Sequence, residues 1–232
     1  MSVVNVLSGG AAAAVVKGVQ AHFERDSGAT VQATFSAVGQ MRDQLLAGSP
    51  CDLVILTKQL VAQLVASGHV VAGSERSLGL VRTGVAVRAG ATRPAIGDRA
   101  QLAAAFRAAR EIYYPDPQLA TAGIHFMNVL KALGLDQELK GAFRPFPNGA
   151  TAMAAMAKST EAAAIGCTQE TEINYTQGVE LVGSLPNEFE LATDYTLGIC
   201  TGAREPKLAA KLAELVVGPA SAEIRRQGGF AF

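Results

Sequence analysis

The stretch VVNVLSGG, residues 3–10, is a short β-rich run that ends in a turn of small residues. The segment Ala11–Arg25 follows with apolar residues at helical spacing, and Gly28 marks its end. The pattern recurs twice, with strands predicted over Thr30–Phe35 and Asp52–Leu56 and helices over Gln40–Ala47 and Thr57–Ser67. Regular alternation of strands and helices is typical of a parallel sheet covered by helices. The first third of the chain therefore predicts an α/β fold.

The rest of the chain predicts a second set of β/α units and a return to the first set. Predicted helices are Asp98 or Arg99 to Ala109, Ile124–Leu133, Gly149–Lys158 and Lys207–Val217, with a strand at Glu111–Tyr114 and a buried strand at Ala162–Cys167. Long extended runs near residues 78–88 and 185–201 join the two sets. We therefore expect one lobe of residues 1–80 plus 195–232, a second lobe of residues 81–194, and a ligand cleft between them.

The composition restricts the classes of partner. The chain has 232 residues, with 20 Lys+Arg against 20 Asp+Glu, so its formal net charge is +0. This balance argues against general electrostatic binding to nucleic acid or to an anionic membrane. Hydrophobic residues make up 49% of the chain, which allows a sizeable core. The apolar runs are far shorter than the roughly 20 residues that cross a bilayer, so we expect no membrane insertion.

The first residues leave the compartment open. The chain enters a strand pattern directly after Met1, with no signal-peptide pattern. We expect a periplasmic protein if a signal peptide has been removed, and a cytoplasmic one if Met1 is the genomic start. The cysteines Cys51, Cys167 and Cys200 stand in apolar runs at wide spacings, which predicts buried free thiols rather than a metal motif or a disulfide framework. We expect a monomer without metal or cofactor.

Four small-residue turns follow predicted strands and open predicted helices. They are Ser8–Ala11, Ser36–Gly39, Ala120–Gly123 and Asn148–Thr151. The start of a helix presents unpaired N–H groups and a partial positive charge, so several such starts together form an anion site built from backbone. Ligands of open α/β sheets bind beyond the carboxyl ends of the strands, where these turns lie. The predicted ligand-binding residues are Ser8, Gly9, Gly10, Ser36, Val38, Gly39, Thr57, Arg82, Thr121, Ala122, Gly123 and Gln169.

Side chains add little to this predicted site. Arg82 lies in the first extended run, where it either contacts a carboxylate ligand or forms a salt bridge at the domain interface. Thr168 and Gln169 follow a predicted strand and suit uncharged ligand contacts, whereas we expect Glu170 and Glu172 to be exposed in a turn. His125 stands in the first turn of a predicted helix and is a catalytic candidate only if the protein is an isomerase.

Five segments of the chain resemble the type II periplasmic substrate-binding proteins, in particular the molybdate-binding-protein-like branch. They are Val6–Gly10, Phe35–Gly39, Ala47–Ile55, Gly84–Gly90 and Tyr114–Pro117, the last followed by Ala122–Phe126. The resemblance covers nearly the whole chain. It implies two α/β lobes joined by two crossings, with the ligand between them, and an ABC-type importer as membrane partner.

The resemblance also bears on the ligand. Ala11 and Val38 occupy the places where oxyanion-binding members carry hydroxyl residues, and the segments around Ser8–Gly10 and Gly123–Phe126 are more similar to a sub-branch containing aconitate isomerase-type proteins. We therefore expect a di- or tricarboxylate rather than a tetrahedral oxyanion. The alternative is an isomerase that moves a proton along an unsaturated polycarboxylate in the same cleft. A ligand-sensing regulatory domain is disfavoured because no DNA-binding segment accompanies it.

Overall fold

In the computed structural model, which describes residues 2–232, the N-terminal part of the chain forms a mostly parallel sheet. Its strands β1 (Val3–Gly9), β2 (Thr30–Ser36) and β3 (Leu53–Thr57) pair in parallel, with β1 in the middle. Strand β9 (Ala192–Ile199) pairs with β3 antiparallel, which gives the order β2-β1-β3-β9. Strand β3 is apolar on both faces because helices cover both.

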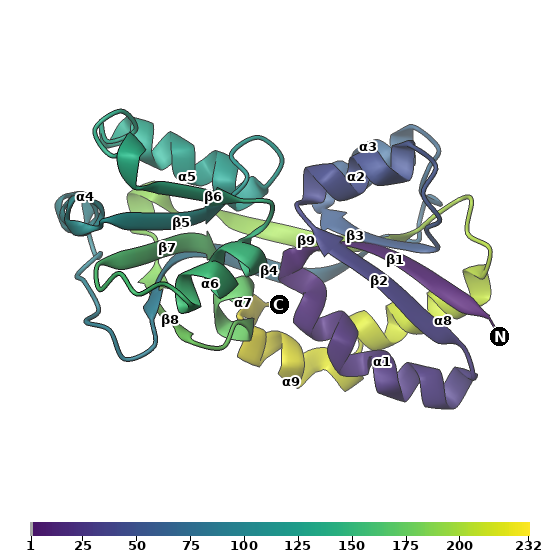
Figure 1. Cartoon of the computed structure of the whole chain (residues 1–232). Coiled ribbons are helices and arrows are strands. Elements are labelled where there is room, and N and C mark those ends of the chain that lie inside the picture. The colour runs from purple at the N-terminus through teal and green to yellow at the C-terminus, as the bar shows by residue number, and fades with distance from the viewer. Residues whose placement is uncertain (1) are drawn as a thin grey trace. The chain divides into compact units, whose positions relative to one another are not determined.

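Helices cover both faces of this sheet (Figure 1). Helices α2 and α3 lie on one face, and α1, α8 and α9 lie on the other. Their bounds are α1 (Ala13–Ser27), α2 (Val38–Leu46), α3 (Lys58–Ala66), α8 (Pro206–Val217) and α9 (Pro219–Gly228). A 3-10 turn, Gly10–Ala12, precedes α1. The short strand β10 (Phe230–Ala231) pairs antiparallel with the first part of β4 (Arg76–Arg88).

Contacts along the chain divide it into two compact units. The first unit comprises the chain up to Val81 together with Thr193–Phe232, and the second comprises Arg82–Ala192. Strands β4 and β9 are the segments in which the chain passes from one unit to the other. The first unit is thus discontinuous in sequence, because its last segment follows the second unit along the chain.

The second unit repeats the plan of the first. Strand β5 (Glu111–Pro115) pairs in parallel with β6 (Phe143–Phe146) and with β7 (Ala164–Gln169). The second part of β4 pairs antiparallel with β7 and with β8 (Val179–Ser184). The helices of this unit are α4 (Arg99–Ala108), α5 (Thr121–Ala132), α6 (Gly149–Ala157) and α7 (Glu170–Tyr175). Residues Lys140–Ala142 and Asn187–Phe189 form 3-10 turns.

Two apolar clusters fill the second unit, one on each face of its sheet. Residues Ile112 and Tyr114 of β5 belong to one cluster and Tyr113 to the other, as the two-residue period of a strand requires. Helices α4 and α5 supply Phe106 and Phe126 to the first cluster, where the two rings meet edge to face at 5.2 Å between centroids. Helices α6 and α7 cover the opposite face (Figure 1).

The predicted α/β class is confirmed, and most predicted elements end within a few residues of their predicted bounds. The main differences are at helix starts: α2 begins at Val38 and α5 at Thr121, so parts of two predicted turns are the first turns of helices. Helix α7 and strand β10 were not expected. Within residues 2–232, no helix combines the length and the apolar character that crossing a bilayer requires.

Candidate functional site

The carboxyl ends of the three parallel strands of the first unit meet at one edge of its sheet. Gly9 lies beside Ser36 in the pairing of β1 with β2, and Thr57 of β3 lies opposite Tyr195 of β9. A Cβ added to Gly9 would stand 2.7 Å from Val38 Cγ1 and 3.1 Å from Tyr195 Cε1. Gly9 is therefore in close contact with the start of α2 and with β9. The predicted site residues of the first unit come together from three separate strand–helix connections.

The hydroxyl groups at this edge are engaged within the unit. Ser8 is fully buried and its Oγ donates to the Gly9 carbonyl at 2.9 Å. The Ser36 Oγ donates to Gln40 Oε1 at 2.5 Å, and Thr57 Oγ1 accepts the Leu60 N–H at 3.4 Å. These side chains already hold the turns in shape, so the backbone supplies the more available donors.

The helix starts differ in how they are capped. No side chain caps the 3-10 turn after Gly9, the start of α2 after Ala37, or the start of α5 after Ala120. By contrast, Thr57 caps α3 and Asp98 caps α4. The first N–H groups of a helix lack intrahelical partners, so these three starts, which are among several without a side-chain cap, offer donors and a partial positive charge to an anion. All three belong to turns that the sequence identified.

In the second unit, Gly123 allows the start of α5 to pack tightly against the preceding loop. A Cβ at this position would come within 2.2 Å of the Asp116 carbonyl oxygen and 2.3 Å of the Pro115 carbonyl oxygen. The Asp116 carboxylate accepts the N–H groups of Gln118 and Leu119 at 2.7 and 2.9 Å, which fixes the loop. The predicted residues Thr121, Ala122 and Gly123 thus form a rigid first turn of α5 rather than a loop.

The fourth predicted anion turn, Asn148–Thr151, already holds an anion-type group of the protein. The carboxyl of Glu172 is buried and accepts hydrogen bonds from the N–H groups of Gly149, Ala150 and Gln169. Thr168 Oγ1 donates to Glu172 Oε2 at 2.6 Å. Burial raises the pKa of Glu172, and these hydrogen bonds partly offset the rise. The expectation of an exposed Glu172 was wrong, and the start of α6 is not open to a ligand.

Arg82 is exposed and paired within the second unit. Its Nε donates to Glu190 Oε1 at 2.5 Å, and this hydrogen bond with the carboxylate charge raises the pKa of Arg82. The salt bridge that the sequence left as one of two interpretations therefore exists, although it lies inside one unit. A guanidinium has five N–H donors, so the pairing leaves Arg82 able to bind a further acceptor.

Gln169 ends β7, where it is almost fully buried opposite Thr83 of β4. Sequence reasoning missed two neighbouring threonines. The Oγ1 atoms of Thr83 and Thr171 are buried and have no hydrogen-bond partner in residues 2–232. The register of β4 with β7 identifies Thr83, and a single sequence does not reveal that register.

The ring of His125 is fixed by a backbone contact. Its Nε2 lies 2.7 Å from the Phe189 carbonyl oxygen. Because a carbonyl only accepts, Nε2 carries the proton in the neutral ring and Nδ1 carries the lone pair. His125 therefore has one nitrogen with which to exchange a proton.

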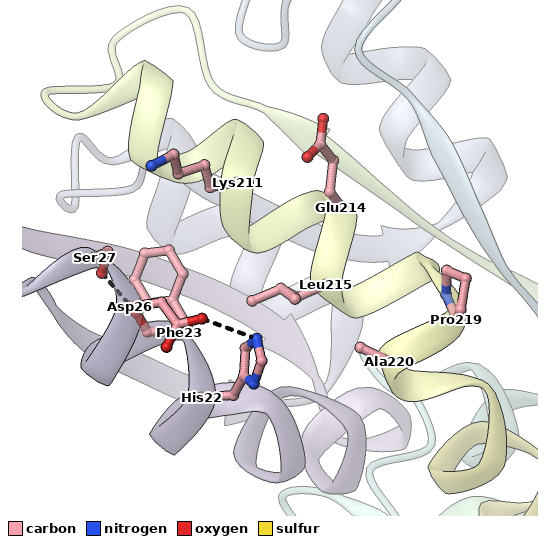
Figure 2. A pocket seen from close by; sticks show the side chains of 9 residues that line it. All are labelled: His22, Phe23, Asp26, Ser27, Lys211, Glu214, Leu215, Pro219 and Ala220. Atoms are coloured by element: carbon pink, nitrogen blue, oxygen red, sulfur yellow. Dashed lines mark hydrogen bonds and ion pairs between the residues drawn. The ribbon is translucent and has the colours of Figure 1, made fainter.

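A surface groove lies elsewhere in the first unit, between α1 and the pair α8 and α9 (Figure 2). It has a cavity volume of about 320 Å³. Its lining residues are His22, Phe23, Asp26, Ser27, Lys211, Glu214, Leu215, Pro219 and Ala220. These include the last turns of α1, which lie at the starts of β1 and β2, so the groove is at the sheet edge opposite the uncapped helix starts. The His22–Asp26 ion pair spans 3.2 Å at its rim.

The sequence of the chain is similar to those of known proteins. Residues 4–231 match a protein family described as bacterial extracellular solute-binding protein. An aconitate isomerase from a Pseudomonas species is 24% identical over 237 residues, covering 99% of this chain and 87% of that protein.

Two solved structures are similar over nearly the whole chain. The periplasmic molybdate-binding protein of Azotobacter vinelandii gives a TM-score of 0.81 at 17% identity, covering 99% of both chains. The sulfate-binding protein SubI of Mycobacterium tuberculosis gives a TM-score of 0.75 at 14% identity, covering 99% of this chain and 86% of that one. These similarities confirm the type II periplasmic-binding-protein fold.

Proposed function

Because the chain belongs to the family of bacterial extracellular solute-binding proteins, we propose that it captures a small anion as the solute-binding component of an ABC-type importer. The observation that carries the proposal is the pair of uncapped helix starts after Gly9 and Ala37, which the register of β1 with β2 brings to one sheet edge. The extracellular location of the family favours the periplasmic one of the two locations that the sequence left open.

The chemistry of the site favours recognition through the backbone. A chain with balanced charge has no general attraction for anions, whereas aligned N–H groups bind one small anion locally. The start of α5 is the corresponding uncapped feature of the second unit. That the ligand is bound between the two units stays a prediction from the sequence.

We propose a di- or tricarboxylate as the ligand. The hydroxyls of Ser8 and Ser36 donate within the first unit, and Ala11 and Val38 have no hydroxyl to offer a tetrahedral oxyanion. Arg82 has the donor geometry for a carboxylate. The name of the Pseudomonas relative refers to a tricarboxylate, whereas the names of the two solved structures refer to molybdate and sulfate.

The direct test is thermal stabilisation by a panel of anions: citrate, cis-aconitate, trans-aconitate, molybdate, tungstate and sulfate. A ligand at roughly a hundred times its Kd adds about 2.7 kcal/mol to the free energy of unfolding. Stabilisation by carboxylates alone supports the proposed ligand class. Stabilisation by molybdate or sulfate alone refutes that class and keeps the solute-binding role.

The aconitate isomerase relative favours a second candidate function, the isomerisation of an unsaturated polycarboxylate. This reaction needs one acid–base group within reach of a carbon-bound proton, and Nδ1 of His125 is the available lone pair. Incubating the protein with cis-aconitate in D₂O and recording NMR spectra separates the candidates. Deuterium in the recovered acid establishes the isomerase, and unchanged acid after prolonged incubation supports the binding protein.

The proline variant Val38→Pro should weaken anion binding at least tenfold. Val38 is the first residue of α2 and Ala37 before it is extended, so proline fits the helix start and removes the Val38 N–H together with the valine side chain. A charge-assisted hydrogen bond contributes about 1.5–3 kcal/mol, which corresponds to this loss. Isothermal titration with the best anion of the panel measures it. Val38→Ala is the matched control because it shortens the side chain and keeps the N–H; equal affinities of the two variants would contradict the backbone site.

The variant Arg82→Ala should weaken binding of citrate or aconitate at least tenfold and change stability by less than about 1 kcal/mol, because its ion pair with Glu190 is exposed. The control Glu190→Ala removes the same ion pair and keeps the guanidinium, so it should bind as the wild type does. If both variants bind equally well, Arg82 has only its role in the salt bridge.

A further inference from the structure

Two cysteines that are far apart in sequence meet inside the first unit. Cys51 directly precedes Asp52 and β3, and Cys200 directly follows β9, the antiparallel neighbour of β3. Their Sγ atoms are 3.4 Å apart. Both side chains are buried, with 8% and 3% of their surface exposed. The third cysteine, Cys167, lies in β7 of the second unit.

Hydrogen bonds hold both cysteines in this arrangement. The Cys200 N–H donates to the Asp52 carbonyl at 3.0 Å, which fixes the backbone of one cysteine beside the residue that follows the other. The Cys51 Sγ lies 3.3 Å from the Leu53 carbonyl oxygen. A disulfide requires the sulfurs to approach by about 1.3 Å to reach its bond length. The approach that the bond requires of the two sulfurs is therefore short.

We propose that Cys51 and Cys200 form a disulfide bond when the chain folds in an oxidising compartment, and that Cys167 stays a thiol. The oxidant is a disulfide of a small thiol or of a dithiol oxidoreductase. One cysteine thiolate attacks it and releases one thiol, forming a mixed disulfide, and the second thiolate then releases the other thiol. Two protein thiols and one external disulfide thus give one protein disulfide and two external thiols. This site is independent of the ligand and of whether the protein is an enzyme.

The environment determines when the bond forms. The hydrogen bond with Cys51, together with burial, raises the pKa of Cys200, so its thiolate is scarce in the folded unit and exchange there is slow. Both sulfurs are accessible before the first unit closes, so the bond forms during folding. It encloses the whole of Arg82–Ala192, and closing so long a loop restricts the unfolded chain strongly.

The test is refolding of the full chain from denaturant with a mixture of oxidised and reduced glutathione. The proposal predicts one free thiol per chain, a mass lower by two hydrogen atoms, and a Cys51–Cys200 linked peptide in a non-reducing digest. Of three thiols, only Cys167 should react with a thiol reagent in denaturant. The oxidised protein should melt about 5–10 °C higher than the same protein treated with dithiothreitol.

Single variants make the outcome specific. Cys51→Ser and Cys200→Ser should each lose the linked peptide and the effect of dithiothreitol on the melting temperature. Cys167→Ser should keep both, because its sulfur is not part of the pair. Three reactive thiols in protein that has refolded with glutathione, as judged by circular dichroism, would overturn the proposal. A linked peptide that contains Cys167 would overturn it as well.

Discussion

Replacing Asp52 by alanine is expected to lower the free energy of unfolding by about 4 kcal/mol, because buried donors lose their acceptor. The carboxylate of Asp52 is buried and accepts four N–H groups. They belong to the backbone and side chain of Asn5, at 2.7 and 3.1 Å, and to the backbones of Arg204 and Glu205, at 2.6 and 3.0 Å. The single side chain thereby ties β1 to the start of β3 and to the turn after β9. Urea unfolding followed by circular dichroism measures the loss.

Two controls separate the carboxylate's role from general damage. Asp52→Asn keeps one oxygen as an acceptor, so it should lose about half as much stability as Asp52→Ala. Asp43→Ala removes an exposed carboxylate of α2 that pairs with neighbouring Arg42, and should change stability by less than about 0.5 kcal/mol. If Asp52→Ala lowers the free energy of unfolding no more than Asp43→Ala does, the hydrogen bonds of Asp52 do not stabilise the first unit.

Replacing Glu172 by alanine is expected to cost about 3 kcal/mol in the free energy of unfolding. The N–H groups of Gly149, Ala150 and Gln169 and the hydroxyl of Thr168 would lose their common acceptor inside the second unit. The isosteric variant Glu172→Gln keeps an acceptor oxygen and should lose less than half as much. Urea unfolding of both variants against the wild type gives the comparison, and equal losses would contradict the role given to the acceptor oxygen that Glu172→Gln keeps.

The same two proteins should differ in their response to pH. The folded unit raises the pKa of Glu172, so the native state binds its proton more tightly than the unfolded chain does. The contribution of Glu172 to stability is therefore full below the ordinary pKa of a glutamate and is lost as the pH rises through the higher folded pKa. Glu172→Gln does not titrate, so the difference in stability between wild type and variant should move in favour of the variant as the pH rises. A difference that is constant with pH would contradict this assignment.

The element pattern could be read from the sequence because it depends on local signals. The apolar run Leu53–Leu56 and the helical spacing within Ala13–Phe23 are visible without a structure, and so are the small residues that follow β1 and β2. Uncapped helix starts are predictable for the same reason, since Gly9, Ala37 and Ala120 have no side-chain acceptor to place.

What the sequence did not reveal is which partners folding brings together. Arg82 pairs with Glu190, which stands 108 positions later in the sequence. Cys51 lies beside Cys200, which stands 149 positions later. Glu172 was expected to be exposed because two carboxylates that stand two residues apart in a turn usually are. It is buried, and its carboxyl accepts hydrogen bonds from the N–H groups of Gly149 and Ala150 at the start of α6, more than 20 residues earlier in the sequence. A single sequence carries no signal of these pairings, so the occupied turn at Asn148–Thr151 looked the same as the open ones.

The occupied start of α6 also bears on where the protein can bind anions. Because Glu172 is covalently attached, it competes for the N–H groups of Gly149 and Ala150 as an intramolecular ligand, which is present whatever anions are dissolved. The protein thereby excludes environmental anions from one of its helix starts by keeping a permanent internal competitor there. Removing that competitor would leave a vacancy shaped for a single carboxylate, which formate or acetate could fill.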